Sequence, residues 1–165
     1  MRAELEQTYR QHRQTLFSLA LTITGCSGLA EDAVHEAFVR LCQRTDRPAG
    51  SFPAYVYSSV RNAAVDCRRR QQRQKSVLES VFAESGSGLV AEAANGLSDP
   101  AEQRAQLASA IETLDESARQ IIVMKIFGDL TFDEIAEVLE TPSATVATRY
   151  RRSILKLEEI LRRNP

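Results

Sequence analysis

The chain has 165 residues, enough for one ordinary domain or two small ones, and its low aromatic content of 6%, without tryptophan, favours helices over β-sheet. Its net charge of −1 is unevenly distributed: residues 1–75 carry 12 basic and 7 acidic side chains, residues 76–117 carry 1 and 8, and residues 118–165 carry 8 and 7. A protein that held DNA alone through its phosphates would be strongly basic throughout, so a DNA-binding role for this chain requires a partner.

The sequence lacks the features of a membrane or disulfide-stabilised protein. It contains no run of about eighteen apolar residues, and its N-terminus lacks the apolar core of a signal peptide. Its three cysteines, Cys26, Cys42 and Cys67, are odd in number and form no Cys-x-x-Cys pair. We therefore expect a cytoplasmic protein without membrane insertion or a metal site. Cys42 and Cys67 lie on apolar helix faces and should be buried.

Two amphipathic helices are predicted at residues 5–23 and 30–42, because apolar side chains recur there at every third or fourth position. Gly25 should end the first of them, and His12 on that helix is expected to be half-buried rather than a ligand. The second helix has a polar outer face formed by Glu31, Asp32, His35, Glu36, Arg40 and Gln43. Its acidic first turns suit the helix dipole, and the same face could dock against a basic protein partner.

A loop at residues 44–53 leads into a third helix, which starts at Ala54 and runs into residues 68–75, where five of eight side chains are basic. Three rings, Phe52, Tyr55 and Tyr57, precede this basic run. Basic side chains that can pair with a phosphate backbone, next to rings on which unpaired bases can stack, are typical of proteins that bind single-stranded nucleic acid. Such a basic run could also be a solvated helix end. Glycine, serine and asparagine breakers then predict a flexible linker at residues 76–99, with one short helix near residues 76–83.

After the linker, Pro100 should open a helix, and residues 116–127 should form another that Gly128 closes. Thr131 and Glu134 then have the spacing of a capping box, and the next helix breaks at residues 140–142 before another begins at Ser143. Two helices joined by so short a corner form a helix-turn-helix. Glu140 occupies the corner position where glycine is often found.

The exposed face of the last helix begins with small polar side chains and continues with arginines. Small side chains let a helix approach base edges in the major groove, and arginines a turn later can reach phosphates. A solvated basic face on an ordinary helical corner is the alternative. The candidate DNA-contacting residues on this face are Thr145, Ala147, Thr148, Arg149, Arg151 and Arg152.

The two halves together resemble an extracytoplasmic-function (ECF) sigma factor of the sigma-70 family, a small initiation subunit of bacterial RNA polymerase. Residues 30–41, AEDAVHEAFVRL, are similar to the family's helix that docks on the polymerase clamp, with His35 where glutamine is usual. The resemblance implies polymerase contacts at Asp32, His35, Glu36 and Arg40.

Residues 52–57 and 61–69 resemble the family's segment that melts and reads the minus-ten promoter element, with Tyr55 where tryptophan is common. The helix-turn-helix resembles the domain that reads the minus-thirty-five element, with Ala147 where lysine is frequent. The resemblance implies minus-ten contacts at Phe52, Tyr55, Tyr57, Arg61, Asn62, Asp66, Arg69 and Arg70.

The sequence therefore predicts an all-α protein of two small helical domains. Residues 1–75 would form a three-helix domain like sigma region 2, residues 76–99 a linker, and residues 100–165 a four-helix domain like sigma region 4. Its partners would be core RNA polymerase and promoter DNA, with an anti-sigma factor as a further candidate. Neither a catalytic set nor a cofactor is expected. The rival hypotheses are a free-standing helix-turn-helix regulator that acts without polymerase, and a helical interaction protein such as an anti-sigma antagonist.

Overall fold

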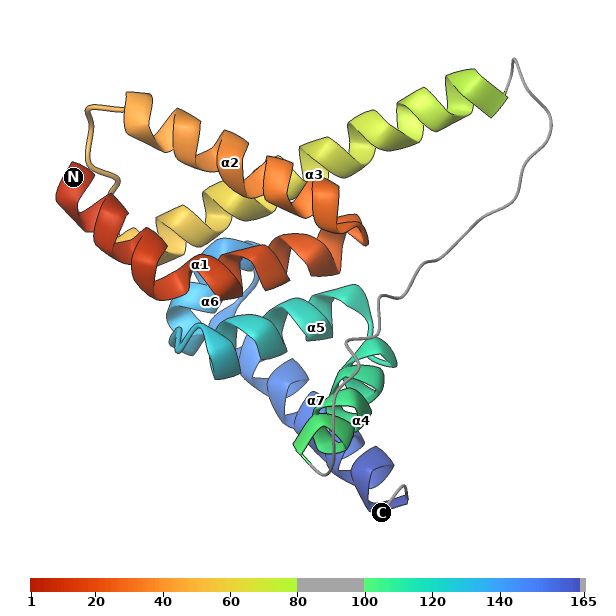
Figure 1. Cartoon of the computed structure of the whole chain (residues 1–165). Helices are drawn as coiled ribbons and strands as arrows, with labels where there is room; N and C mark the ends of the chain where they lie inside the picture. The colour runs from red at the N-terminus through yellow and green to blue at the C-terminus, as the bar shows by residue number, and fades with distance from the viewer. Residues whose placement is uncertain (80–99, 164–165) are drawn as a thin grey trace.

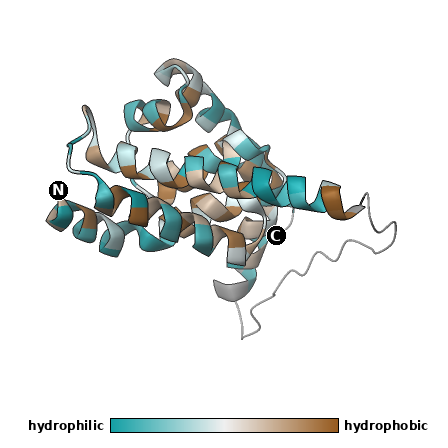
Figure 2. Ribbon diagram, turned by 90° about the horizontal axis from the view of Figure 1, so that it is seen from above, coloured by the Kyte–Doolittle hydropathy of each residue, from teal (hydrophilic) through white to brown (hydrophobic). Residues whose placement is uncertain are grey.

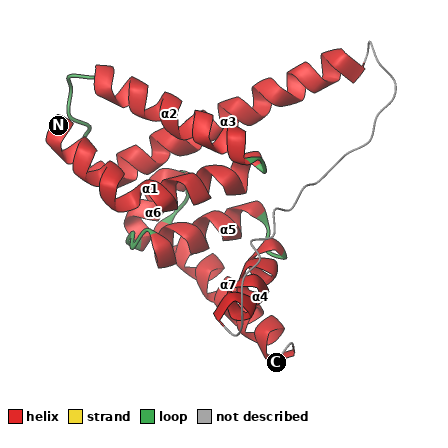
Figure 3. Ribbon diagram, viewed as in Figure 1, coloured by secondary structure: helices red, strands yellow, loops and turns green. Residues whose placement is uncertain are grey.

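The computed structural model describes residues 1–79 and 100–163, and within these ranges the chain is helical apart from short loops and turns (Figures 1 and 3). The all-α prediction is confirmed. In the described ranges, none of the helices combines the length and apolarity needed to cross a lipid bilayer. The elements are α1 (Arg2–Thr24), α2 (Ser27–Gln43), α3 (Phe52–Glu79), α4 (Pro100–Glu112), α5 (Glu116–Ile122), the π-helical segment η1 (Val123–Phe127), α6 (Phe132–Leu139) and α7 (Ser143–Arg163).

The N-terminal half packs α1, α2 and α3 against one another. Gly25 ends α1 in the left-handed conformation at φ 68°, as its position in the sequence predicts. The third helix is longer than expected, because α3 continues to Glu79 without a break at residue 75. Its last turns project from the bundle and are mostly hydrophilic (Figure 2). The rest of the predicted linker, residues 80–99, lies outside the described residues.

The C-terminal half contains the predicted helix-turn-helix in α6 and α7. Thr131 accepts a hydrogen bond from the Glu134 backbone while the Glu134 carboxylate accepts one from the Thr131 backbone, so the capping box is confirmed. Glu140 ends α6 in the left-handed conformation at φ 50°, the role that glycine usually takes. A small core of its own, formed by Ala110, Leu114, Ala118, Ile122 and Leu157, holds α4, α5 and α7 together.

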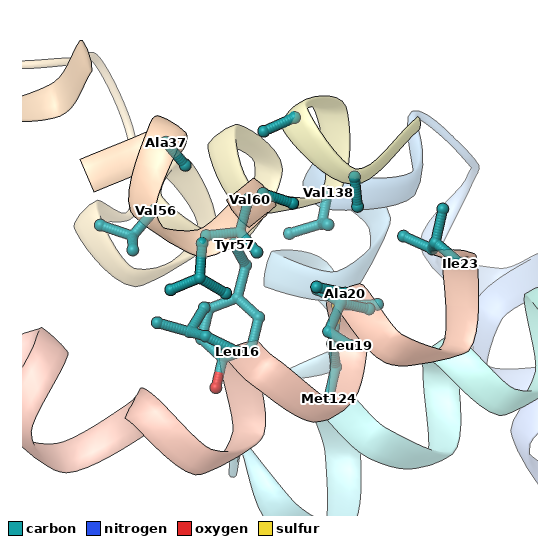
Figure 4. Packing of buried hydrophobic residues seen from close by; sticks show 14 of the residues in the cluster. Leu16, Leu19, Ala20, Ile23, Ala37, Val56, Tyr57, Val60, Met124 and Val138 are labelled. Atoms are coloured by element: carbon teal, nitrogen blue, oxygen red, sulfur yellow. The ribbon is translucent and has the colours of Figure 1, made fainter. Parts of the chain in front are cut away.

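The two halves also share a larger core. One cluster of buried side chains includes Leu16 and Tyr57 from the N-terminal half and Met124 and Val138 from the C-terminal half (Figure 4). In Figure 1, α5 and α6 lie directly beneath α1 and α3. Because apolar surface from both halves is buried in one cluster, their packing is favourable in water.

The burial of the two cysteines on apolar helix faces agrees with the prediction for one of them only. Cys67 is buried at 5% exposure, as expected. The prediction for Cys42 was wrong, because its side chain is exposed near the end of α2, where it lines an open groove between α1 and α2.

Candidate functional site

The outer face of α2 carries the predicted polymerase contacts. Asp32, His35 and Arg40 are exposed, and Glu36 is half-buried. The Glu36 carboxylate pairs with Arg40 one turn along α2 and with Arg70 of α3, whose Nη2 lies 2.6 Å from Glu36 Oε2. The hydrogen bond to Glu36, with a further contact to Cys67, raises the pKa of Arg70. Helical spacing alone did not predict that Glu36 joins the predicted polymerase surface to the predicted minus-ten surface.

An open groove of about 820 Å³ lies beside this face, between α1 and α2. Tyr9 and Phe38 meet across it edge to face, with ring centroids 4.8 Å apart. His35 lines the groove together with charged side chains from both helices. The groove therefore continues the α2 face as a partly apolar surface.

The predicted minus-ten residues on α3 fall into an open group and a covered group. Asn62, Arg69 and Arg70 are exposed, whereas Phe52, Tyr55 and Asp66 are half-buried. The Arg44 guanidinium donates a hydrogen bond of 2.6 Å to the Tyr55 hydroxyl and lies 5.9 Å from the centre of its ring. The Asn62 amide and the Arg69 guanidinium are therefore open to a ligand, whereas Arg70 is exposed but paired with Glu36.

Tyr57 belongs to the covered group, which differs from the prediction of a base-stacking ring. Its side chain is 0% exposed, and its hydroxyl lies 3.1 Å from His12 Nδ1. Burial raises the pKa of the Tyr57 phenol well above its usual value, and a hydrogen bond with Thr15 offsets only part of this rise. In this arrangement Tyr57 cannot meet a base, because α1 covers it through His12 and the C-terminal half covers it through Gly128.

The C-terminal half also covers Arg61, whose Nε donates a hydrogen bond of 3.1 Å to Gln120 Oε1 of α5. Three more polar contacts join the halves. Arg68 Nη1 lies 2.7 Å from Glu116 Oε2, the Thr15 hydroxyl donates to the Phe127 carbonyl over 3.0 Å, and the Ser51 hydroxyl donates to Glu134 over 2.6 Å.

Glu134 links the capping box to this boundary between the halves. Partial burial alone would raise the pKa of Glu134, but hydrogen bonds from Ser51 and Thr131 outweigh that effect and lower it. The stabilisation from these bonds is therefore complete above the ordinary pKa of glutamate and is lost as the pH falls through the lowered value.

Sequence reasoning missed these boundary residues. The one signal available was Gln120, a polar residue directly before the apolar run of residues 121–124, which the structure buries at 3% exposure. A buried amide requires a hydrogen-bond partner, and Arg61 and Glu116 supply it.

The predicted recognition surface lies on the first half of α7. Thr148, Arg149, Arg151 and Arg152 are exposed, and Thr145 and Ala147 are half-buried. Val146 is 0% exposed and anchors α7 in the core, so the opposite face of α7 points outward. Arg149 Nη1 donates to the Ser117 hydroxyl over 2.9 Å, which holds this side chain across the corner toward α5.

Comparisons with known proteins agree with the architecture. A family model for sigma-70 region 2 matches residues 8–74, and one for sigma-70 region 4 matches residues 104–157. The chain is 27% identical over 161 residues to the ECF RNA polymerase sigma factor SigL of Mycobacterium tuberculosis, covering 94% of this chain and 87% of SigL. It is 23% identical over 149 residues to SigK of Mycobacterium ulcerans, covering 88% of this chain and 79% of SigK.

Among solved structures, the fold is similar to that of the sigma factor RpoE from Bartonella quintana, crystallised with the anti-sigma factor NepR. The TM-score is 0.69 at 19% identity, and the match covers 98% of this chain and 99% of RpoE. Both sigma regions are present in the expected order, and the relatives that match nearly the whole chain are ECF sigma factors. The chain belongs to the ECF sigma factors of the sigma-70 family.

Proposed function

We propose that this sigma factor directs transcription initiation through three surfaces. The polymerase-binding surface comprises Asp32, His35, Glu36 and Arg40. The minus-ten surface comprises Phe52, Tyr55, Tyr57, Arg61, Asn62, Asp66, Arg69 and Arg70, and the minus-thirty-five surface comprises Thr145, Ala147, Thr148, Arg149, Arg151 and Arg152. The observation that carries this proposal is that the three sets lie on α2, α3 and α7 of a chain with both sigma regions. The proposed domains are residues 1–75 and 100–165, joined by residues 76–99.

The proposed mechanism is binding rather than bond chemistry. The α2 face attaches the chain to polymerase, α7 enters the major groove upstream, and α3 captures bases from the melted strand. Unstacking costs a few kcal/mol, which ring stacking and contacts to base edges offset. Because polymerase holds both DNA contacts at once, neither needs to be tight alone, which fits a chain whose net charge is −1.

An anti-sigma factor is proposed as a further partner. RpoE, which shares this fold, was crystallised with an anti-sigma factor. The partly apolar groove between α1 and α2 lies next to the proposed polymerase surface, so a protein bound there would compete with polymerase.

Replacing Asn62 with alanine is expected to reduce open-complex formation while leaving polymerase binding unchanged. The Asn62 side chain is exposed on α3, so its loss removes an amide available to an extruded base without opening a cavity in the core. Permanganate footprinting of holoenzyme on promoter DNA measures the opening, and pull-down with core polymerase is the control. Unchanged promoter opening would remove Asn62 from the proposed surface.

Replacing Arg149 with alanine is expected to weaken promoter binding by about 1–3 kcal/mol if the side chain reads a base edge. The loss would then depend on the sequence of the minus-thirty-five element. If Arg149 meets a phosphate, binding weakens evenly for all sequences and the salt slope falls by about one. Titrations at several salt concentrations with matched and altered upstream elements distinguish these two roles, and wild-type binding in both would exclude Arg149 from the interface.

A further inference from the structure

We propose that Arg44 is a positioning residue for the minus-ten contact, because it fixes the ring of Tyr55 in place before a base arrives. This inference rests on the proposed base-stacking role of Tyr55. It deepens that role by adding a residue outside the predicted minus-ten set, one that acts on DNA only through Tyr55.

The backbones of the two residues are fixed at the two ends of the loop that joins α2 to α3. Arg44 caps the C-terminus of α2 in an extended conformation, with φ −82° and ψ 141°, and its N–H donates to the Leu41 carbonyl over 3.2 Å. Tyr55 lies in the first turn of α3, where its N–H donates to the Ser51 carbonyl over 3.0 Å. The two side chains therefore bridge the ends of this loop.

The bridge lies at the hydroxyl edge of the ring. Arg44 Nη1 donates a hydrogen bond of 2.6 Å to the Tyr55 hydroxyl, while the guanidinium carbon lies 5.9 Å from the ring centre. Stacking on a ring face would bring that carbon to a van der Waals separation of about 3.5–4.0 Å. The guanidinium of Arg44 therefore lies beyond the hydroxyl, where it holds the ring without occupying a face on which a base can stack.

The core holds the rest of the Tyr55 side chain. This residue is half-buried and packs against the larger cluster of buried side chains. With the core on one side and Arg44 at the hydroxyl, the ring has lost rotational freedom before DNA binds. Ordering a side chain during binding costs free energy, so a ring that is already ordered binds its ligand more tightly.

Arg44 has no ionic role that competes with this contact in the part of the chain that the structure describes. Two arginines close to it in sequence pair with carboxylates, Arg40 with Glu36 and Arg47 with Glu4. Arg44 is exposed and takes part in none of the salt bridges of the described residues. Replacing Arg44 therefore removes its contact with the ring without breaking an ion pair.

The state of the ring can be measured in the full-length protein without polymerase or DNA. The four tyrosines are labelled as fluorotyrosine, and the fluorine NMR signal that Tyr55→Phe removes belongs to Tyr55. Arg44→Ala should shift and narrow that signal, because a released ring reorients faster, and should leave the other tyrosine signals in place. Arg47→Ala is the matched control. It removes the same charge from the same loop, but its guanidinium pairs with Glu4, so the Tyr55 signal should not change.

DNA binding is then measured for holoenzyme formed with saturating core polymerase. The probe is a promoter fragment identified by sequencing transcript starts and premelted across its minus-ten element. Arg44→Ala and Tyr55→Phe should each weaken binding about two- to tenfold, because each leaves the ring unfixed. The double variant should bind as weakly as either single variant, since both changes remove the same contact. Arg47→Ala should bind like the wild type.

The salt dependence of binding distinguishes positioning from a direct phosphate contact. A positioning residue releases no counterion of its own, so Arg44→Ala should keep the wild-type salt slope. A slope reduced by about one, or a loss that adds to that of Tyr55→Phe, would assign Arg44 to a phosphate and overturn the proposal. An equal loss in Arg47→Ala would also overturn it, because the charge of the loop would then explain the effect.

The two measurements together decide the remaining outcomes. An unchanged Tyr55 signal in Arg44→Ala would show that the arginine does not hold the ring. A changed signal with wild-type DNA affinity would show that order in the ring does not serve base capture. Failure of the proposed sigma function is separable, because it appears as the absence of core-dependent transcript starts with the wild-type protein, while the fluorine signals are unaffected.

Discussion

Replacing Tyr57 with alanine should lower the free energy of unfolding by about 3–4 kcal/mol. The side chain is among the largest with no exposed surface, and it belongs to the cluster that joins α1 and α3 to the C-terminal half. Removing the ring leaves a cavity at the boundary between the halves and strips His12 of its partner. Urea unfolding followed by far-UV circular dichroism measures the loss.

Tyr57→Phe is the matched control. It keeps the ring and removes only the hydroxyl that contacts His12 Nδ1 over 3.1 Å, so it should cost about 0.5–1.5 kcal/mol. Equal stability of the alanine and phenylalanine variants would contradict the packing described for Tyr57. The phenylalanine variant also retains a surface for base stacking and should retain transcription.

Glu36→Lys should weaken association with core polymerase at least about tenfold. The substitution reverses a charge on the proposed polymerase surface and places a third cation between Arg40 and Arg70. The cost to folding should stay within about 1 kcal/mol, because both arginines are more than half exposed and solvent screens the repulsion. Binding is measured by titrating core enzyme against the labelled full-length protein.

Glu159→Lys provides the control for this variant. Glu159 forms the same type of ion pair with an arginine one turn along its helix, Arg163, but near the end of α7 and at high exposure. It should leave polymerase association near the wild-type value. Equal affinities of the Glu36→Lys and Glu159→Lys variants would remove Glu36 from the interface.

Local features were predictable from the sequence because they depend on neighbours in the chain. The capping box of Thr131 and Glu134 needs only their spacing, and the end of α1 at Gly25 needs only a residue that tolerates a positive φ. At the corner before α7, Glu140 adopts the left-handed conformation although it carries a Cβ. The short connection between two packed helices therefore outweighs the preference of the residue.

The packing between the halves was not predictable, because helical periodicity shows which face is buried but not what covers it. Val56 and Tyr57 are adjacent in the chain, and both are 0% exposed. Successive helical residues point about 100° apart, so burial of both requires cover over a wide arc of α3. The other elements pack on α3 from two directions, α1 and α2 on one side and α6 on another, so Tyr57 is buried although the sequence predicted it as a ring for base stacking.

The most direct test of the central claim, initiation by this chain on polymerase, is reconstituted transcription. Purified full-length protein is added to bacterial core polymerase with a fragmented genomic library as template, and transcript starts are sequenced. Starts that require the added chain and share upstream elements are the predicted result. The absence of such starts on every template, together with failure of the chain to co-elute with core enzyme, would contradict the account.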